Sequence, residues 1–197
     1  MKLIIATRNA HKTQEIAQIL PDCYEVLSLA DFPDAPEVEE TGSTFAANAA
    51  LKALGISEYT DGLILADDSG LCVDALGGEP GIYSARYAGE HGNDAANNAF
   101  LLDKLRALPS EQAPFRARFV CAMCLAQQGQ EIAAFEGTVE GHITLNPEGT
   151  EGFGYDPLFI PDGYDTSFGI LPADIKNSIS HRSNALKMLS DTLKNIQ

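Results

Sequence analysis

The sequence has no tryptophan, and aromatic residues make up only 8% of its 197 residues. Hydrophobic residues nevertheless reach 45%. Aliphatic side chains must therefore supply most of the core, and a chain of this length can bury a sizeable one. Long apolar runs are also missing, because none approaches the roughly 18 residues of a membrane-spanning helix. The opening MKLIIAT is too short for a signal peptide, so we expect a cytoplasmic globular protein with no membrane partner.

Positive charge is scarce. The 13 lysines and arginines face 28 aspartates and glutamates, which leaves a formal net charge of −15. Such an excess opposes binding to long polyanions, so we expect no nucleic-acid partner. A small anion can still bind where basic residues gather locally and a divalent metal screens the remaining charge.

The chain has only four cysteines, Cys23, Cys72, Cys121 and Cys124. All lie in apolar segments, which predicts reduced thiols in the core rather than a disulfide framework. Cys121 and Cys124 have C-x-x-C spacing, but they lie in a run with strand character, whereas a redox pair normally opens a helix. The second pair that a zinc ribbon needs is absent.

Apolar runs and helical periodicity alternate along the chain, which predicts one α/β domain over residues 1–197, with two lobes and a mixed sheet. A first helix ends at Pro21, and Ser43 or Thr44 caps the second. The expected strands cover 2–7, 24–29, 62–67, 117–127 and 131–143, the last two as an antiparallel hairpin. The expected helices cover 9–20, 44–57, 93–108 and a C-terminal segment from Ser180 onward.

The stretch ATRNAHK leads from the first strand into the first helix. A helix N-terminus presents unpaired N–H groups and the positive end of the helix dipole. Thr7, Arg8, Asn9 and Lys12 add further donors there for phosphate oxygens. The alternative is that Asn9 only caps the helix and Lys12 is solvated, since no Walker pattern is present.

Carboxylates gather in two further places. Glu39 and Glu40 lie in an acidic loop that precedes a helix carrying Asn48 and Lys52. Asp67 and Asp68 follow a buried run, where we expect the third strand to end and where open α/β sheets bind ligands. Adjacent carboxylates at a core edge need a cation nearby. Hard oxygen ligands of this kind suit Mg²⁺, although acidic residues before a helix often only complement its dipole.

Two C-terminal clusters complete the set. In GFGYDP, the glycines permit close backbone approach, and Phe153 or Tyr155 could stack on a base; the alternative is a simple aromatic turn. In KNSISHR, three basic side chains surround an expected helix start. The candidate substrate-binding residues in these clusters are Phe153, Gly154, Tyr155, Asp156, Lys176, His181 and Arg182.

Five ordered motifs resemble those of the inosine triphosphate pyrophosphatase family, hydrolases of ITP, dITP and XTP. They are T-x-N-x-x-K, EETGSTFAANAALKA, ADDSGLCVDALGGEPGIYSARYAG, GFGYDPLF and SHRSNALK, and they span nearly the whole chain. The resemblance implies an elongated mixed β-sheet flanked by helices, with the active site in a cleft between two lobes, and a homodimer. It also implies Mg²⁺-dependent cleavage between the α and β phosphates, giving a monophosphate and pyrophosphate.

The resemblance also implies residue roles. Asp68 resembles the general base and a metal ligand, with Glu39, Glu40 and Asp67 as companion ligands. Thr7, Asn9, Lys12, Lys52 and Ser69 would hold the phosphates, Asn48 would join the substrate site, and His181 and Arg182 would donate to the 6-keto oxygen of the base. Many members have glycine where this chain has Arg8, so backbone approach to phosphate is altered or the guanidinium itself reaches a phosphate.

Two other functions fit part of the sequence. A pyrophosphatase for modified pyrimidine triphosphates would share the phosphate chemistry. A non-catalytic acidic metal-binding protein would show no turnover, and it would leave the clustering of Lys12, Lys52, Lys176 and Arg182 unexplained.

Overall fold

A computed structural model describes residues 2–21 and 23–196. Six strands form one sheet in the order β2-β1-β3-β4-β5-β6. They are β1 (Lys2–Ile5), β2 (Glu25–Ser28), β3 (Leu63–Val73), β4 (Phe115–Gln127), β5 (Gln130–Ile143) and β6 (Phe159–Pro161). The α-helices are α1 (Ala10–Ile19), α2 (Phe45–Tyr59), α3 (Asp94–Arg106), α4 (Ala173–Ile179) and α5 (His181–Ile196). Four 3₁₀ turns, Leu29–Asp31, Asp74–Leu76, Gly81–Arg86 and Ser110–Gln112, join them.

The sheet is mixed, as expected. β1 runs parallel to β2 and β3, whereas β5 runs antiparallel to β6. The predicted hairpin is confirmed as β4 and β5, which are joined by Gln128 and Gly129 at φ 52° and 73°. Two consecutive residues with positive φ make the type of tight turn that suits the twist of paired strands.

One boundary prediction is wrong. The third strand does not end at Asp67 and Asp68 but continues to Val73. β1 pairs with it only as far as Leu65, while β4, its neighbour on the other side, is 13 residues long. The two carboxylates therefore lie just beyond the end of β1, inside a strand that β4 keeps extended.

The helix boundaries follow their caps. The Thr44 side chain accepts the Ala47 N–H at 3.1 Å, and Asn93 accepts the Ala96 N–H at 3.0 Å. Of the two caps expected for the second helix, Ser43 and Thr44, the structure has Thr44. Lys176, expected in an irregular stretch, lies instead on the short helix α4, which Pro172 precedes as its N-cap. Seven residues are too few to show a clear apolar period in the sequence.

The chain divides into two compact units. Unit 1 comprises Met1–Asp68, Cys121–Gly137 and His181–Gln197, and unit 2 comprises Ser69–Val120 and Thr138–Ser180. Strands β3, β4 and β5 contribute residues to both. Within residues 2–21 and 23–196, no helix has both the length and the apolar character needed to cross a membrane.

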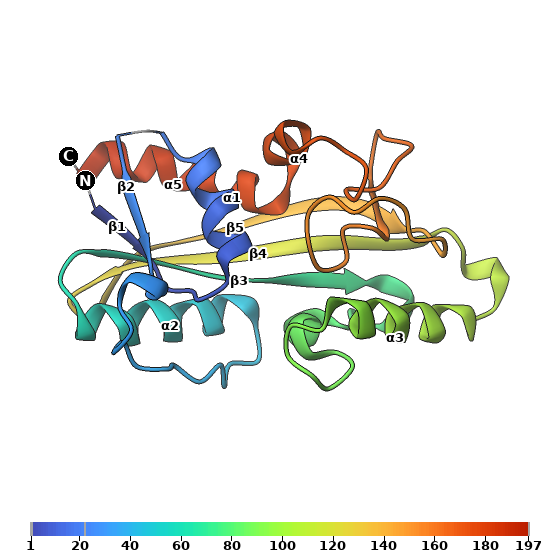
Figure 1. Ribbon diagram of the computed structural model, residues 1–197, viewed down its shortest axis with the longest axis horizontal. Helices are drawn as coiled ribbons and strands as arrows, with labels where there is room; N and C mark the ends of the chain where they lie inside the picture. Colours follow the sequence, from blue (N-terminus) through green and yellow to red (C-terminus); the bar gives the residue numbers. More distant parts are fainter. Residues whose placement is uncertain (1, 22, 197) are drawn as a thin grey trace. The chain divides into compact units, whose positions relative to one another are not determined.

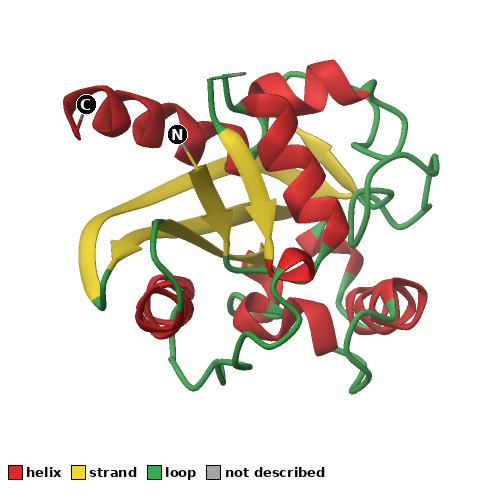
Figure 2. Cartoon of the chain, turned by 60° about the vertical axis from the view of Figure 1, so that its left-hand side comes forward, coloured by secondary structure: helices red, strands yellow, loops and turns green. Residues whose placement is uncertain are grey.

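Unit 1 has a core on each face of its strands, because side chains alternate along a strand. Leu65 and Met123 point toward α1 and α5, whereas Ile64 and Ala122 point toward α2. Figure 1 shows α1 and α5 on one side of these strands and α2 on the other, and Figure 2 shows the strands in yellow. This alternation decides which helix each carboxylate of β3 meets.

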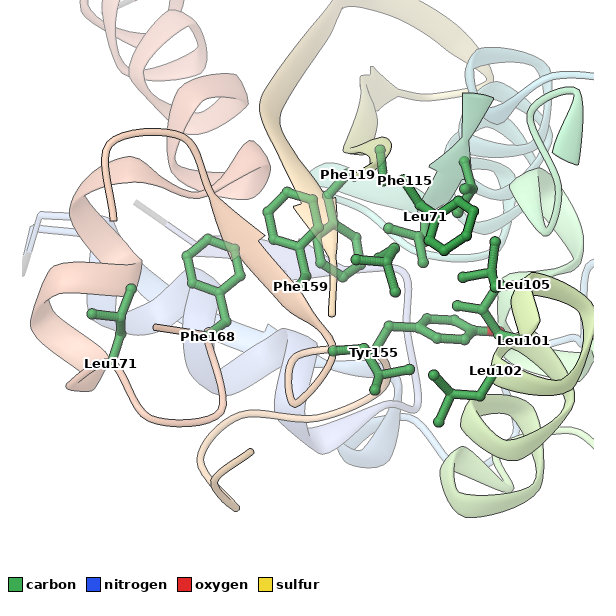
Figure 3. Close-up of a cluster of buried hydrophobic side chains, with 14 residues drawn as sticks. Leu71, Leu101, Leu102, Leu105, Phe115, Phe119, Tyr155, Phe159, Phe168 and Leu171 are labelled. Carbon is green, nitrogen blue, oxygen red and sulfur yellow. The ribbon is translucent and has the colours of Figure 1, made fainter. Parts of the chain in front are cut away.

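Unit 2 has an aromatic core. Phe119, Phe159 and Phe168 lie together, with ring centroids 4.8 to 6.4 Å apart. Figure 3 shows these rings with Tyr155 and with leucines of α3. The few aromatic residues of the sequence are thus concentrated where unit 2 needs large side chains.

All four cysteines are free thiols. Cys121 and Cys124 are buried on strand β4, where a spacing of three places them on opposite faces, so the prediction of reduced core thiols is confirmed for these two. Cys72 is half-buried. Cys23 is exposed, so its assignment to the core is wrong; it precedes β2 in the connection from α1.

Candidate active site

The start of α1 is held by its own cap. The Asn9 side chain accepts the N–H groups of His11 and Lys12 at 3.0 and 3.2 Å, and Thr7 Oγ1 accepts the Asn9 N–H at 3.1 Å. Asn9 is therefore the N-cap, as the structural alternative proposed. Lys12 is not simply solvated, because its ammonium pairs with Oδ1 of Asp67 on β3.

Asp67 is fully buried and has three donors around its carboxylate. Lys12 contacts Oδ1, while Oδ2 accepts from Arg182 Nε at 3.0 Å and from the Cys121 thiol at 2.9 Å. Burial alone would raise the pKa of Asp67, but Arg182 and Lys12 hold that pKa well below its usual range. Asp67 is therefore held as a carboxylate by its two cationic neighbours.

Arg182, in the first turn of α5, is 1% exposed, and its Nη1 pairs with Glu15 of α1. Burial would lower the pKa of this guanidinium, but Asp67 and Glu15 raise it. Gly137 of β5 permits the approach of α5, because a Cβ there would lie 2.3 Å from the carbonyl oxygen of His181. His181, the residue before Arg182, is also buried.

Asp68 points to the opposite face of β3 and meets α2. Its Oδ2 accepts from Asn48 Nδ2 at 3.1 Å, and its Oδ1 lies 3.8 Å from Lys52 Nζ. Asn48 also accepts the Gly42 N–H at 2.8 Å. A Cβ on Gly42 would lie 2.6 Å from the Asn48 amide oxygen, so glycine is required for this approach.

Lys52 joins the acidic loop to the strand. Its ammonium contacts Glu40 Oε1 at 2.6 Å and the main-chain oxygen of Asp67 at 2.8 Å. The Lys12 ammonium lies 3.5 Å from the same oxygen, so two lysines from different helices meet at one residue of β3. Glu39 is exposed.

The two neighbouring carboxylates differ in acidity. Burial raises the pKa of Asp68, and Lys52 and Lys12 offset that effect only in part. Asp67, with Arg182 in addition, remains ionised. Asp68 is therefore the better proton acceptor of the two, because its charge is less compensated.

The Arg8 guanidinium donates hydrogen bonds to two main-chain carbonyl groups. Its Nη1 donates to the carbonyl of Leu29 at 3.3 Å and its Nη2 to that of Ala35 at 3.0 Å. These bonds join the start of α1 to the segment that leads into the acidic loop. Of the two interpretations of Arg8, neither included this role.

In unit 2, the GFGYDP turn surrounds a buried ion pair. Asp156 Oδ2 accepts from Lys176 Nζ at 2.6 Å and from the Phe153 N–H at 2.8 Å. The Lys176 ammonium lies 5.0 Å from the Phe153 ring centroid. Gly152 has φ +73°, and a Cβ there would lie 2.0 Å from the Asp156 carboxylate, so this position requires glycine.

Helix α3 fixes the tip of that turn. Asp94 Oδ2 accepts the Gly154 N–H at 2.7 Å, and Asn98 Nδ2 donates to the Gly154 carbonyl at 3.0 Å. Tyr155 is buried in the core with its hydroxyl donating to Ser84 O at 2.9 Å. Its burial favours Phe153 as the stacking residue.

The sequence interpretation did not identify Glu15, Cys121, Asp94 and Asn98, which hold candidate site residues in place. Glu15 alone carried a signal, because it lies three residues after Lys12 and so on the same helix face. Ser69 is half-buried and follows Asp68 on β3.

Fold and site define an α/β protein in which two lysines, one from the first turn of α1 and one from the middle of α2, meet beside a pair of strand carboxylates. The chain belongs to the Ham1 family, whose model matches residues 3–192. The resemblance seen in the motifs is thereby confirmed at the level of the family.

Similar proteins align with this chain over nearly its full length. A dITP/XTP pyrophosphatase from Exiguobacterium sp. is 52% identical over 96% of this chain and 95% of its own. The Staphylococcus aureus Ham1 protein superposes with a TM-score of 0.86 at 42% identity, covering 100% of both chains. A nucleoside-triphosphatase / dITP/XTP pyrophosphatase from Mycobacterium abscessus gives 0.76 at 43% identity, covering 96% and 98%.

Proposed function

We propose that this protein hydrolyses deaminated purine nucleoside triphosphates, dITP, XTP and ITP, to the monophosphate and pyrophosphate. The observation that carries the proposal is the meeting of Lys12 and Lys52 at Asp67, next to the buried carboxylate of Asp68. Two ammonium groups suit the charge of a polyphosphate, and a carboxylate with a raised pKa suits a general base. Family membership and the names of the relatives support the same activity.

The residues fit a divalent cation, although no three His, Cys, Asp or Glu side chains among those described already form a metal site. Glu40 and Asp68 are hard oxygen donors that share one ammonium, that of Lys52, and Asp68 is short of compensating charge. We assign Mg²⁺ to these two carboxylates, with exposed Glu39 as a further candidate ligand. Asp67, also a predicted ligand, has Lys12, Arg182 and Cys121 on its oxygens, so its position favours a role as counter-ion.

When bound, Mg²⁺ would neutralise phosphate charge and polarise the phosphorus under attack. Asp68 would orient a water molecule and accept its proton. Lys12 and Lys52 would hold the phosphates and compensate the charge of the departing pyrophosphate. Thr7, Asn9, Asn48 and Ser69 are further candidates for substrate contact, in addition to their roles in the structure.

For the base, we propose the turn residues of unit 2. Phe153 offers a ring for stacking, beside Gly154, and the Asp156–Lys176 pair offers an acceptor and a donor. His181 and Arg182 remain candidates for donation to the 6-keto oxygen. Adenine carries an amino group there, so donors would meet a donor, and an unpaired buried polar group discriminates strongly.

The cleft between two lobes, the single domain over 1–197, the cytoplasmic location and the homodimer are likewise proposals that rest on the resemblance. The pyrimidine triphosphate alternative predicts a different substrate preference, and the non-catalytic alternative predicts no turnover.

Product analysis tests the activity. With Mg²⁺ and dITP, XTP or ITP, chromatography should show the monophosphate and pyrophosphate, and EDTA should abolish turnover. A diphosphate with orthophosphate would refute cleavage between the α and β phosphates. A panel that includes ATP, GTP and modified pyrimidine triphosphates separates the three functions.

A further inference from the structure

Glu15 closes a ring of four charged side chains in unit 1. It lies three residues after Lys12, so both side chains leave the same face of α1. Lys12 pairs with Oδ1 of Asp67, and Glu15 pairs with Nη1 of Arg182. The Nε of that guanidinium donates to Oδ2 of Asp67 at 3.0 Å. The contacts thus lead from α1 through β3 and α5 back to α1.

The ring leaves little freedom to its members. The side chain of Arg182 is 1% exposed and that of Glu15 12%. A guanidinium is planar, so fixing both Nε and Nη1 fixes the orientation of the whole group. Its hold on Asp67 Oδ2 therefore also orients Oδ1, the oxygen that Lys12 contacts.

We infer that Glu15 is a positioning residue for the phosphate site. Through Arg182 it holds the Asp67 carboxylate in the orientation that places the Lys12 ammonium. Glu15 itself touches no substrate. The inference rests on the proposed function in one respect, namely that Lys12 binds the pyrophosphate portion of the substrate.

A double-mutant cycle tests this role with inorganic pyrophosphate as the probe. Calorimetry in the presence of Mg²⁺ would give the Kd for wild type, Glu15→Gln, Lys12→Met and the double variant. If Glu15 acts through Lys12, Glu15→Gln weakens binding by about 5- to 30-fold in the wild-type background, as for coupled residues. In the Lys12→Met background it should change the Kd less than about twofold.

Glu25→Gln is the matched control, because Glu25 is an exposed glutamate of unit 1 that pairs with the exposed Lys2 at 3.9 Å. It should leave the Kd unchanged. Thermal unfolding of each variant monitors the fold. Should Glu15→Gln fail to fold at the assay temperature, Arg182→Lys replaces it in the same cycle, because lysine cannot bridge both carboxylates in the plane of a guanidinium.

A purely structural Glu15 would change the Kd by the same factor in both backgrounds, and that result overturns the inference. So does a Glu15→Gln variant that binds pyrophosphate as wild type does, or a wild type that does not bind it. Turnover of dITP and XTP by wild type is measured separately. A wild type that binds pyrophosphate but hydrolyses neither refutes the proposed function and leaves the cycle interpretable.

Discussion

The Asp68→Asn variant tests whether this carboxylate accepts the proton of the attacking water. The substitution keeps size and shape, and the new amide oxygen can still accept from Asn48 Nδ2, now at 3.1 Å from Oδ2. It removes the negative charge and the ability to accept a proton. We expect kcat to fall at least about 100-fold, the low end for a positioned general base. That factor corresponds to about 2.7 kcal/mol of activation free energy.

The free energy of unfolding should not fall with kcat. Asp68 Oδ1 lies 3.8 Å from Lys52 Nζ, which at an effective dielectric constant of about 20 is worth about 4 kcal/mol of attraction. Removing a carboxylate from water costs several kcal/mol as well. The raised pKa of Asp68 shows that this cost outweighs the attraction. Lys52 keeps Glu40 and the Asp67 carbonyl, so the substitution leaves no unpaired ammonium.

The direction of the Asp68 pKa shift predicts how the free energy of unfolding depends on pH. A group whose folded-state pKa lies above its unfolded value contributes stability that is full below the unfolded pKa, here 3.8, and is lost as the pH rises through the folded pKa. Asp68→Asn has no such loss. Its free energy of unfolding relative to wild type should therefore rise with pH above about 3.8 and then level off.

Pyrophosphate release measures kcat, and urea titrations between about pH 4 and 8 measure stability. Asp61→Asn, in the exposed bend that precedes the same strand, is the control and should match wild type in both assays. A kcat within tenfold of wild type would assign the base to another carboxylate, Asp67 first. A variant less stable than wild type at every pH would refute the electrostatic argument.

Three further variants test other parts of the site. Lys176→Met leaves the carboxylate of Asp156 buried without its ammonium, so urea unfolding should show a loss of about 3 to 5 kcal/mol; a loss under about 1 kcal/mol would mean that the pair is solvated. Arg8→Met removes two hydrogen bonds to backbone and should cost about 1 to 3 kcal/mol while leaving KM for ITP within about threefold; a larger rise in KM would place the guanidinium on a phosphate. Arg182→Ala should lower kcat/KM for ITP by about 30- to 1000-fold, or 2 to 4 kcal/mol, and should lower it less for dATP, which shares only the part of the loss that comes through Asp67 and Lys12; equal losses for both substrates would remove Arg182 from base recognition.

Local chemistry explains which parts of the fold could be predicted. Caps such as Thr44 and Asn93 act within one helical turn, so a few neighbouring residues determine them. The end of β3 could not be predicted, because the strand stays extended through pairing with β4, about 50 residues later in the sequence. Helix α4 was too short for its period to be recognised.

In the candidate site, too, some features could be predicted from the sequence and others could not. The resemblance of the motifs already grouped Lys12 and Lys52 as phosphate donors, and the structure brings both ammonium groups to the main-chain oxygen of Asp67. The partners of Arg182 could not, since Glu15 and Asp67 come from elements more than 100 residues earlier in the sequence. A basic side chain that could bind a phosphate or a base could equally pair with a buried carboxylate, and the sequence alone does not distinguish these two partners.

Asp67 and Asp68 are neighbours in the sequence, yet their side chains lie in different surroundings. Because side chains alternate along β3, Asp67 enters the face of unit 1 covered by α1 and α5, and Asp68 enters the face covered by α2. The first face supplies an ammonium and a guanidinium, which hold the pKa of Asp67 low. The second supplies one nearby ammonium that Glu40 shares, and the pKa of Asp68 is raised. These opposite surroundings are the reason why we propose Asp67 as a fixed counter-ion and Asp68 as the proton acceptor.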